Sequence, residues 1–342
     1  MPLDTGPSAP TLAAVSRKLD FLWIELTNRC NLRCVHCYTD SGPETGVRDR
    51  LDADDYRRLM RDAYALGCRK LQFIGGEPQL NADFLALLVT AREIGFTFIE
   101  VFTNLTRLAP KTLAFARENG IRFATSVYSD RPEAHDAVTR VRSSHARTVG
   151  NLRRLVADGV ATRAAIIAVD QPKAEIARTE TFLRDLGVPH VRSARTQPIG
   201  RGEAVAGRAA CLDGLCGHCW RGKLCVAPDG FAYACVMARD WPVGNVLTDP
   251  LAAIVGGDAL ESVRRRVHDQ VWLPRLQASA CPPDGEPGPD SEPGAGKDLP
   301  EPAEECPQSC TPDDAGGDCA PHGCPQSCEP FIVVCEPTVG TE

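Results

Sequence analysis

Three kinds of segment are missing from this chain of 342 residues, and each absence excludes a class of protein. No apolar run approaches the roughly 20 residues that a bilayer-spanning helix needs. The N-terminus lacks the charged start and the apolar stretch of a secretory signal. Basic residues do not gather into the kind of patch that binds nucleic acid. We therefore expect a cytoplasmic protein that binds neither a membrane nor a nucleic acid.

Charge is also distributed unevenly along the chain. The formal net charge is −7, yet the segment from Cys281 to Glu342 contains 14 acidic residues and a single base, Lys297. Residues 282–304 are rich in Pro, Gly and acidic side chains, which is typical of an extended linker. We expect an N-terminal extension (1–19), a main domain (20–200), a smaller unit (201–281), this linker (282–304) and a cysteine-rich tail (305–342).

Cysteine is scarce in the first 200 residues, which contain four, although the whole chain has 16. Disulfide frameworks belong to short, secreted, loop-rich chains, and this sequence has no secretory signal. Ligation of a metal or a cluster is therefore the preferred interpretation of the cysteines. Disulfides and inert thiols remain the alternatives.

Strand-like and helix-like segments alternate through the main domain. Hydrophobic spacing predicts strands at 21–27, 70–74, 97–103, 122–127, 162–169 and 190–193. It predicts helices at 52–66, 82–94, 110–119, 145–158 and 173–186. Such alternation favours an α/β fold in which helices cover a parallel sheet, open or barrel-like. Catalytic groups are then expected at the carboxyl ends of the strands.

The pattern changes after residue 200. Residues 224–234 are expected to form a hairpin turned by Pro228-Asp229-Gly230, and residues 251–267 a helix. The tail beyond the linker has six cysteines and little apolar sequence, so it needs cross-links or metal to fold.

The strongest motif is Cys30-x3-Cys34-x2-Cys37, directly after the first strand. Ferredoxin-type sites supply four cysteines to a cubane cluster, whereas this loop supplies three and leaves one iron open. The motif resembles that of the radical S-adenosylmethionine (SAM) superfamily. The resemblance implies a partial (β/α)6 TIM-like barrel and a 4Fe–4S cluster whose open iron is chelated by SAM. Reductive cleavage of SAM then gives a 5′-deoxyadenosyl radical that abstracts a substrate hydrogen. A zinc knuckle is the alternative.

Further positions match the same family. Gly75-Gly76-Glu77-Pro78 follows the second strand and resembles the family's GGEP motif, which implies binding of the methionyl amine. The resemblance implies further SAM contacts from residues near the cysteine motif and at later strand ends, namely Tyr38, Asn104, Ser126 and Arg140. Asn104 is otherwise a turn former, Asp136 a helix cap and Arg140 a surface charge.

The last third resembles the SPASM/twitch extension that binds auxiliary 4Fe–4S clusters. Ten residues separate Cys219 from Gly230, and four residues separate Gly230 from Cys235. The resemblance implies one or two auxiliary clusters, with further ligands from Cys306, Cys310, Cys319, Cys324, Cys328 and Cys335. Four cysteines are left over as further ligands or a hydrogen-atom donor: Cys211, Cys216, Cys225 and Cys281. Cys68 is expected in the core.

The resemblance to SPASM-type members implies an oxidoreductase-type maturase in natural-product biosynthesis that modifies a ribosomally made (RiPP) precursor peptide. It would form a thioether or carbon–carbon cross-link, epimerise a residue or oxidise a side chain. The implied partners are the precursor peptide and a flavodoxin or ferredoxin-type reductant. The first 18 residues are too short for a peptide-recognition domain, so a separate protein or another surface would recognise the leader. A small-molecule dehydrogenase or epimerase, for instance of an aminosugar, and a non-catalytic iron–sulfur electron carrier remain alternatives.

Overall fold

The computed structural model describes residues 18–279. They belong to two compact units divided between Trp272 and Leu273. Helix α11 (Leu273–Ser279) is the described part of the second. Cys281, the predicted linker at 282–304 and every tail cysteine lie outside the described residues, as does most of the N-terminal extension.

In the described part of the first unit, residues 18–272, the strands form a nine-stranded sheet in the order β6-β5-β4-β3-β2-β1-β7-β8-β9. Every pair of adjacent strands in the part β6-β5-β4-β3-β2-β1-β7 is parallel. Strand β8 pairs antiparallel with both β7 and β9. The strands are β1 (Phe21–Glu25), β2 (Lys70–Ile74), β3 (Phe98–Phe102), β4 (Arg122–Ser126), β5 (Thr162–Ala168), β6 (His190–Arg195), β7 (Lys223–Val226), β8 (Phe231–Tyr233) and β9 (Pro242–Asn245). The predicted α/β fold with a parallel sheet is confirmed.

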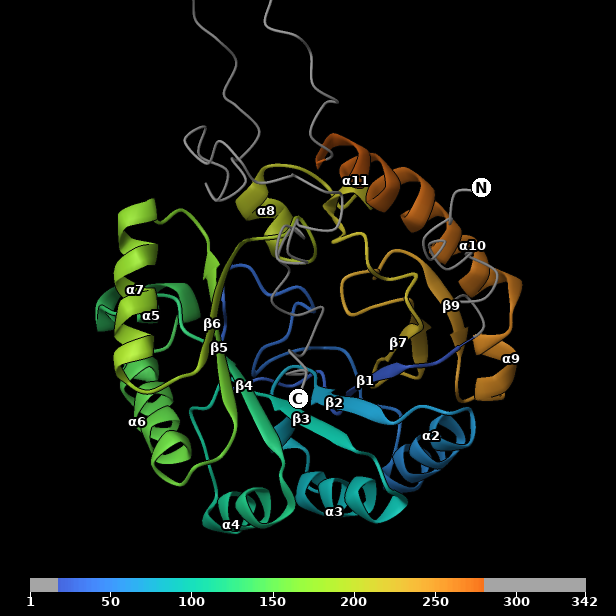
Figure 1. Ribbon diagram of the computed structural model, residues 1–342, viewed down its shortest axis with the longest axis horizontal. Coiled ribbons are helices and arrows are strands. Elements are labelled where there is room, and N and C mark those ends of the chain that lie inside the picture. The colour runs from blue at the N-terminus through green and yellow to red at the C-terminus, as the bar shows by residue number, and fades with distance from the viewer. Residues whose placement is uncertain (1–17, 280–342) are drawn as a thin grey trace, which may run out of the picture. The chain divides into compact units, whose positions relative to one another are not determined.

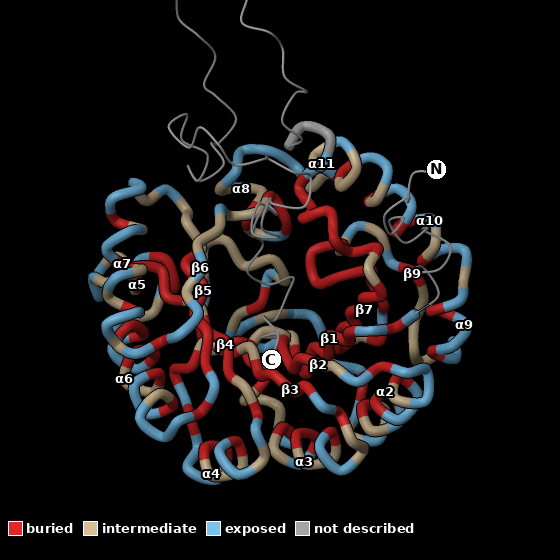
Figure 2. The backbone as a smooth tube through the Cα atoms, viewed as in Figure 1, coloured by how far each residue is buried: buried red, intermediate tan, exposed pale blue. Residues whose placement is uncertain are grey.

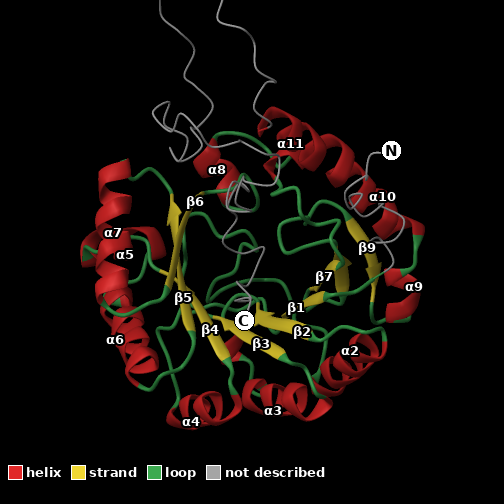
Figure 3. Ribbon diagram, viewed as in Figure 1, coloured by secondary structure: helices red, strands yellow, loops and turns green. Residues whose placement is uncertain are grey.

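Helices cover the outer side of this curved sheet, as Figures 1 and 3 show. They connect the successive strands and are α2 (Ala53–Ala65), α3 (Phe84–Ile94), α4 (Pro110–Asn119), α5 (Pro132–Thr139), α6 (Ser144–Ala157) and α7 (Lys173–Asp185). Local sequence sets their ends. Asp52 and Asp55 form a capping box at the start of α2, and Gly95 ends α3 with a left-handed φ of 105°.

Burial is highest in strands β1 to β5 and β7, whereas β6 at the edge of the sheet is partly exposed (Figure 2). Four of the largest fully buried side chains are Trp23, Phe73, Phe96 and Phe123. Strands buried on both faces are expected where helices cover a parallel sheet. Within the described residues, no helix has the length and apolar character that crossing a membrane would require.

The region after β6 differs from the prediction in two ways. The predicted hairpin exists, but its first strand, β7, pairs in parallel with β1 and so extends the main sheet. Hydrophobic spacing identifies a strand but not its partner, which is why the sequence did not reveal this pairing. The predicted helix at 251–267 is two helices, α9 (Leu251–Val255) and α10 (Asp258–Val267), because Gly256 and Gly257 interrupt it.

Short elements that were not predicted include α5, β9 and α8 (Gly202–Ala206). Helix α5 has only eight residues and begins with Pro132 at its first position, which fits a helix start. Elements this short give too few repeats for hydrophobic spacing to be recognised.

Candidate active site

A pocket lies at the carboxyl ends of the parallel strands. The three cysteines of the N-terminal motif line it, together with backbone and side chains that follow β2, β3 and β4. Of the sequence-predicted residues, the pocket brings together Cys30, Cys34, Cys37, Tyr38, Gly75, Gly76, Asn104 and Ser126. This is the edge of the sheet at which the alternating pattern placed catalytic groups.

The cysteine loop is held from two sides by backbone contacts. The amides of Arg33 and Val35 each donate to a carbonyl at the end of α5, in both cases over 3.0 Å. On the other side Arg201 donates from Nε to the Cys34 carbonyl (2.8 Å) and from its amide to the Cys37 carbonyl (3.0 Å). These contacts fix the backbone from which the three thiols project. Arg201 was not predicted, because nothing in its local sequence marks a residue that binds a loop 160 positions earlier.

Each thiol has a hydrogen-bond donor close to its sulfur. Cys30 Sγ accepts from the Leu32 amide (3.4 Å) and from Asn104 Nδ2 (3.7 Å). The Tyr128 hydroxyl lies 3.9 Å from Cys34 Sγ, and the Thr39 hydroxyl 3.3 Å from Cys37 Sγ.

The first two thiols are also strongly desolvated. Burial raises the pKa of Cys30 and that of Cys34 to about 12, so neither thiol ionises readily on its own. A bound metal deprotonates a coordinating thiol outright, and hydrogen bonds to the sulfurs tune iron–sulfur clusters. Three thiols on one loop, with donors directed at their sulfurs, therefore fit three ligands of an iron–sulfur cluster.

Gly75 and Gly76 press the β2 turn against the backbone of the cysteine loop. The Gly76 amide donates to the Thr27 carbonyl over 2.8 Å, and the Glu77 amide to the Arg29 carbonyl over 2.9 Å. A Cβ on Gly75 would lie 2.7 Å from the Thr27 carbonyl oxygen, and one on Gly76 2.3 Å from that of Arg29. Gly75 also has a φ of 135°. A side chain at either position would collide with the backbone of the cysteine loop, so both positions require glycine. The positive φ of Gly75 favours glycine there as well.

Glu77 joins the ends of β2 and β3 and is 1% exposed. Its carboxylate accepts from the Thr103 hydroxyl (2.7 Å), the Asn104 amide (2.8 Å) and the Gln79 amide (3.1 Å). Burial raises the pKa of Glu77, although these hydrogen bonds oppose the shift. Neither Glu77 nor Pro78 is among the residues that line the pocket. The structure thus shows Glu77 orienting the strand ends around the pocket.

The remaining predicted SAM contact, Arg140, does not line the pocket. It is exposed and has a left-handed φ of 58° at the end of α5. Polar residues that were not predicted as contacts also line the pocket, among them Tyr128, His135, Arg195 and Gln197. Their positions after β4 and at the end of β6 were the available signal, since catalytic groups gather at strand ends.

Three cysteines of the C-terminal region form a second group of thiols. Cys219 Sγ and Cys235 Sγ are 2.7 Å apart, and both residues are buried. Hydrogen bonds to Cys216 and Cys235, together with burial, raise the pKa of the Cys219 thiol. From the sequence, Cys216 is open as a further ligand or a hydrogen-atom donor, and its spacing from Cys219, with two residues between them, favours a ligand. No three Cys, His, Asp or Glu side chains in residues 18–279 are arranged to hold a single metal ion.

The other described cysteines are Cys68, Cys211 and Cys225. Cys68 is fully buried in the core, as the sequence predicted, and Cys225 is fully buried in β7. Neither Cys225 nor Cys211 lines the pocket, and Cys211 Sγ accepts from Arg208 over 3.0 Å.

A buried ion pair links the second group of thiols to the first. The Arg239 guanidinium, four residues after Cys235, bonds both carboxylate oxygens of Glu25 at the end of β1. The Tyr38 hydroxyl, one residue after Cys37, donates to the same carboxylate over 3.4 Å. Burial lowers the pKa of Arg239, but the charge of Glu25 outweighs it and the net shift is upward. The guanidinium therefore stays charged in the interior.

Two segments of the chain match known domain families. Residues 24–183 match the Radical SAM superfamily, and residues 216–282 match SPASM, an iron–sulfur cluster-binding domain. These ranges include the first group of thiols and the second.

Among curated proteins, the chain is similar to GTP 3',8-cyclases. It is 33% identical to the GTP 3',8-cyclase of Limosilactobacillus fermentum over 149 residues. These residues make up 43% of this chain and 42% of the relative. It is 29% identical to the GTP 3',8-cyclase of Heliobacterium modesticaldum over 199 residues. These residues make up 56% of this chain and 59% of the relative. The chain thus spans about half the length of these relatives.

Two solved structures share the fold. Streptococcus suis SuiB bound to precursor peptide SuiA has a TM-score of 0.60 and 15% identity, covering 72% of this chain and 66% of SuiB. Native anSMEcpe with bound AdoMet has a TM-score of 0.55 and 14% identity, covering 71% of this chain and 82% of that chain.

Proposed function

This chain belongs to the radical SAM superfamily and has a C-terminal SPASM domain, and from that premise we propose that it modifies a ribosomally made precursor peptide. The observation that carries the proposal is the meeting of three thiols and the Gly75–Gly76 backbone in one pocket. A 4Fe–4S cluster held by Cys30, Cys34 and Cys37 supplies, together with SAM, the reductive cleavage that generates a hydrogen-abstracting radical. The protein's own task is to bind, orient and exclude water.

We assign the SAM-binding role to residues of the strand ends. Gly75 and Gly76 let backbone approach the ligand closely. The cationic Arg195, at the end of β6, suits the SAM carboxylate, and the Ser126 hydroxyl suits its ribose. Apolar side chains complete the lining and keep water from the reacting atoms: Phe102, Ile167 and Met237.

The second group of thiols favours a reaction in which the substrate itself is oxidised or reduced. We assign Cys216, Cys219 and Cys235 as ligands of an auxiliary cluster, since they lie together in the SPASM segment. An auxiliary cluster supplies a place for the electron that a substrate radical gains or loses. The peptide as substrate is supported by the shared fold, because SuiB was solved with its precursor peptide and anSMEcpe with the peptide Cp18Cys.

The test combines one product of the cofactor with one of the substrate. Reconstituted protein, reductant, SAM and a candidate precursor peptide encoded beside the gene are incubated without oxygen. We expect 5′-deoxyadenosine together with a mass change in the peptide, and neither from the Cys34→Ala variant. 5′-Deoxyadenosine without any change in the peptide would contradict the peptide assignment. No 5′-deoxyadenosine at all would favour a non-catalytic electron carrier.

A nucleotide is the second candidate substrate, and the sequence matches to GTP 3',8-cyclases favour it. The same assay with GTP in place of the peptide separates the two. A GTP-dependent rise in 5′-deoxyadenosine with consumption of GTP would support cyclisation and contradict the peptide proposal. An aminosugar or other small molecule would be tested in the same way.

A further inference from the structure

Tyr128 belongs to the loop that follows β4, and its side chain reaches the cysteine loop. Its hydroxyl is 3.9 Å from Cys34 Sγ, within the range of a hydrogen bond to sulfur. Tyr128 is 8% exposed and lines the pocket. The Ser126 hydroxyl is also within hydrogen-bonding reach of the Tyr128 hydroxyl. The phenol thus has one neighbour that can donate to it and one sulfur that can accept its proton.

Contacts on both sides fix the position of this ring. The Tyr128 amide donates to His135 Nδ1 over 3.2 Å, and its carbonyl accepts from Gln171 Nε2 over 3.3 Å. The His36 ring meets the tyrosine ring edge-on, with centroids 5.1 Å apart and an interplanar angle of 76°. Backbone and ring are therefore held independently of the hydroxyl.

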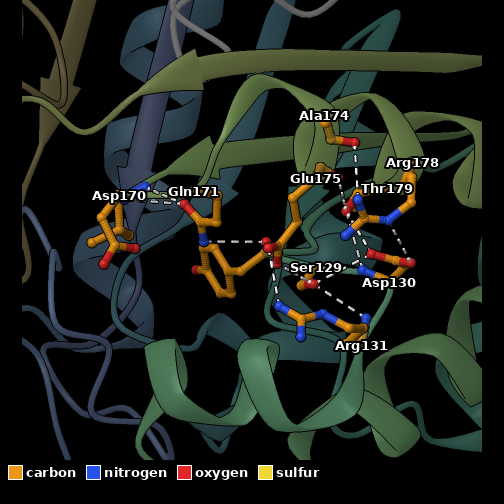
Figure 4. A network of polar contacts seen from close by, with 11 residues as sticks. Ser129, Asp130, Arg131, Asp170, Gln171, Ala174, Glu175, Arg178 and Thr179 are labelled. Atoms are coloured by element: carbon orange, nitrogen blue, oxygen red, sulfur yellow. Dashed lines mark hydrogen bonds and ion pairs between the residues drawn. The ribbon is translucent and has the colours of Figure 1, made fainter.

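Gln171 belongs to a polar network that ties the β4–α5 loop to the start of α7, shown in Figure 4. Its Oε1 accepts from the amides of Val169 (2.6 Å) and Asp170 (3.2 Å), which leaves Nε2 to face the Tyr128 carbonyl. The residue after Tyr128, Ser129, donates from its hydroxyl to Glu175 over 2.8 Å. Two further contacts complete the network: Arg131 donates to Glu175 over 3.0 Å, and the Asp130 amide donates to Thr179 over 3.1 Å.

This network has a clear physical consequence for the loop. Side chains of α7 bind the three residues that follow Tyr128, so the loop has little freedom to move the phenol away from Cys34. Preorganised donors tune a metal site more strongly than mobile ones, because no ordering is needed when charge develops.

We propose that Tyr128 is a positioning residue that donates a hydrogen bond to the Cys34 thiolate and thereby raises the reduction potential of the cluster. The proposal rests on the proposed function, since it requires a cluster at Cys30, Cys34 and Cys37. A donor to a ligating sulfur stabilises the reduced cluster, which carries more negative charge, and so favours accepting an electron. Asn104 Nδ2, 3.7 Å from Cys30 Sγ, acts in the same direction on a second sulfur.

The experiment compares Tyr128→Phe with Tyr64→Phe in the full-length, anaerobically reconstituted protein. The first change removes the hydroxyl and keeps the ring. The second removes a hydroxyl on α2 that lies near Gly95, on a ring that packs against Phe96 rather than a cysteine. Potentiometric titration follows the EPR signal that changes when SAM is added, which separates this cluster from any auxiliary one. We expect equal iron content, a more negative midpoint potential for Tyr128→Phe and no shift for Tyr64→Phe.

Gln171→Leu provides a second measurement, because it releases the Tyr128 carbonyl without touching the phenol. It should shift the potential in the same direction by a smaller amount. Unchanged potentials in both Tyr128→Phe and Gln171→Leu would overturn the proposal. An unchanged potential with weakened SAM affinity would also overturn it and assign the hydroxyl to the cofactor. A wild-type protein without a SAM-responsive signal would instead contradict the proposed function, and the inference with it.

Discussion

Glu25 and Arg239, 214 residues apart in sequence, form a buried ion pair that joins the end of β1 to the segment after Cys235. The side chains are 1% and 17% exposed, respectively. The Arg239 guanidinium also lies over the rings of Tyr233 and Tyr38, at 5.0 and 5.6 Å from their centroids. The pair therefore fixes how the segment after Cys235 packs on the strand that leads into the cysteine motif.

Removing one partner of this pair should be costly. Arg239→Met leaves the Glu25 carboxylate buried without its counter-charge, which destabilises a protein by about 3–5 kcal/mol. Urea unfolding of the variant would measure the loss. The double variant Glu25→Gln/Arg239→Met should recover part of it, because no uncompensated charge remains. Equal stability of wild type and Arg239→Met would contradict this role.

The close approach at Gly76 predicts a local effect on ligand binding. In Gly76→Ala the added methyl would meet the Arg29 carbonyl oxygen at 2.3 Å, so the turn and the cysteine loop must separate. SAM affinity, measured by calorimetry, should fall roughly tenfold or more, which is about 1.4 kcal/mol. The matched control is Gly46→Ala, whose methyl would meet nothing within 4 Å and should bind SAM like the wild type.

Asp136, a residue of α5, accepts hydrogen bonds from the first turn of α6. Its carboxylate accepts from the Ser144 hydroxyl (2.8 Å) and the His145 amide (2.9 Å) at the start of that helix. Asp136→Ala should lower the free energy of unfolding by about 1 kcal/mol. Urea unfolding measures this, and Asp136→Asn, which keeps an acceptor, should lose less.

The same carboxylate predicts a dependence on pH. Burial raises the pKa of Asp136, but the hydrogen bonds from His145, Ser144 and Ser143 outweigh it and hold the pKa below its ordinary value of 3.8. A depressed pKa in the fold means that the stabilisation is complete above the unfolded value and is lost as pH falls through the folded one. The difference in stability between wild type and Asp136→Ala should therefore shrink in acid below pH 3.8. A difference that stays constant there would contradict the assignment.

The second group of thiols predicts a separation of two activities. Cys235→Ala and Cys216→Ala should still cleave SAM without coupling to substrate, yet form no modified product, because both change only the auxiliary site. Their iron content should fall relative to the wild type, whereas the core variant Cys68→Ala should retain it. Full product formation by Cys235→Ala would show that this site is not needed for the reaction.

Local sequence accounts for much of this structure and little of its long-range pairing. The strand Lys70–Ile74 and the helix Pro110–Asn119 have the predicted bounds, because repeated apolar spacing and terminal Gly or Pro residues act locally. The cysteine loop and Gly75–Gly76 could be placed together because both follow neighbouring parallel strands. The pairing of β7 with β1 and the contact between Arg239 and Glu25 depend on how distant segments meet, which no local spacing encodes.

We assign Cys30, Cys34 and Cys37 as the ligands of the cluster at which SAM is cleaved. The most direct measurement is iron content and 5′-deoxyadenosine formation in Cys30→Ala, Cys34→Ala and Cys37→Ala, each reconstituted and reduced beside the wild type. We expect the loss of about four iron atoms per chain, no 5′-deoxyadenosine, and retention of the auxiliary iron. Zinc bound at this loop in the wild type, or 5′-deoxyadenosine formation that survives these substitutions, would contradict it.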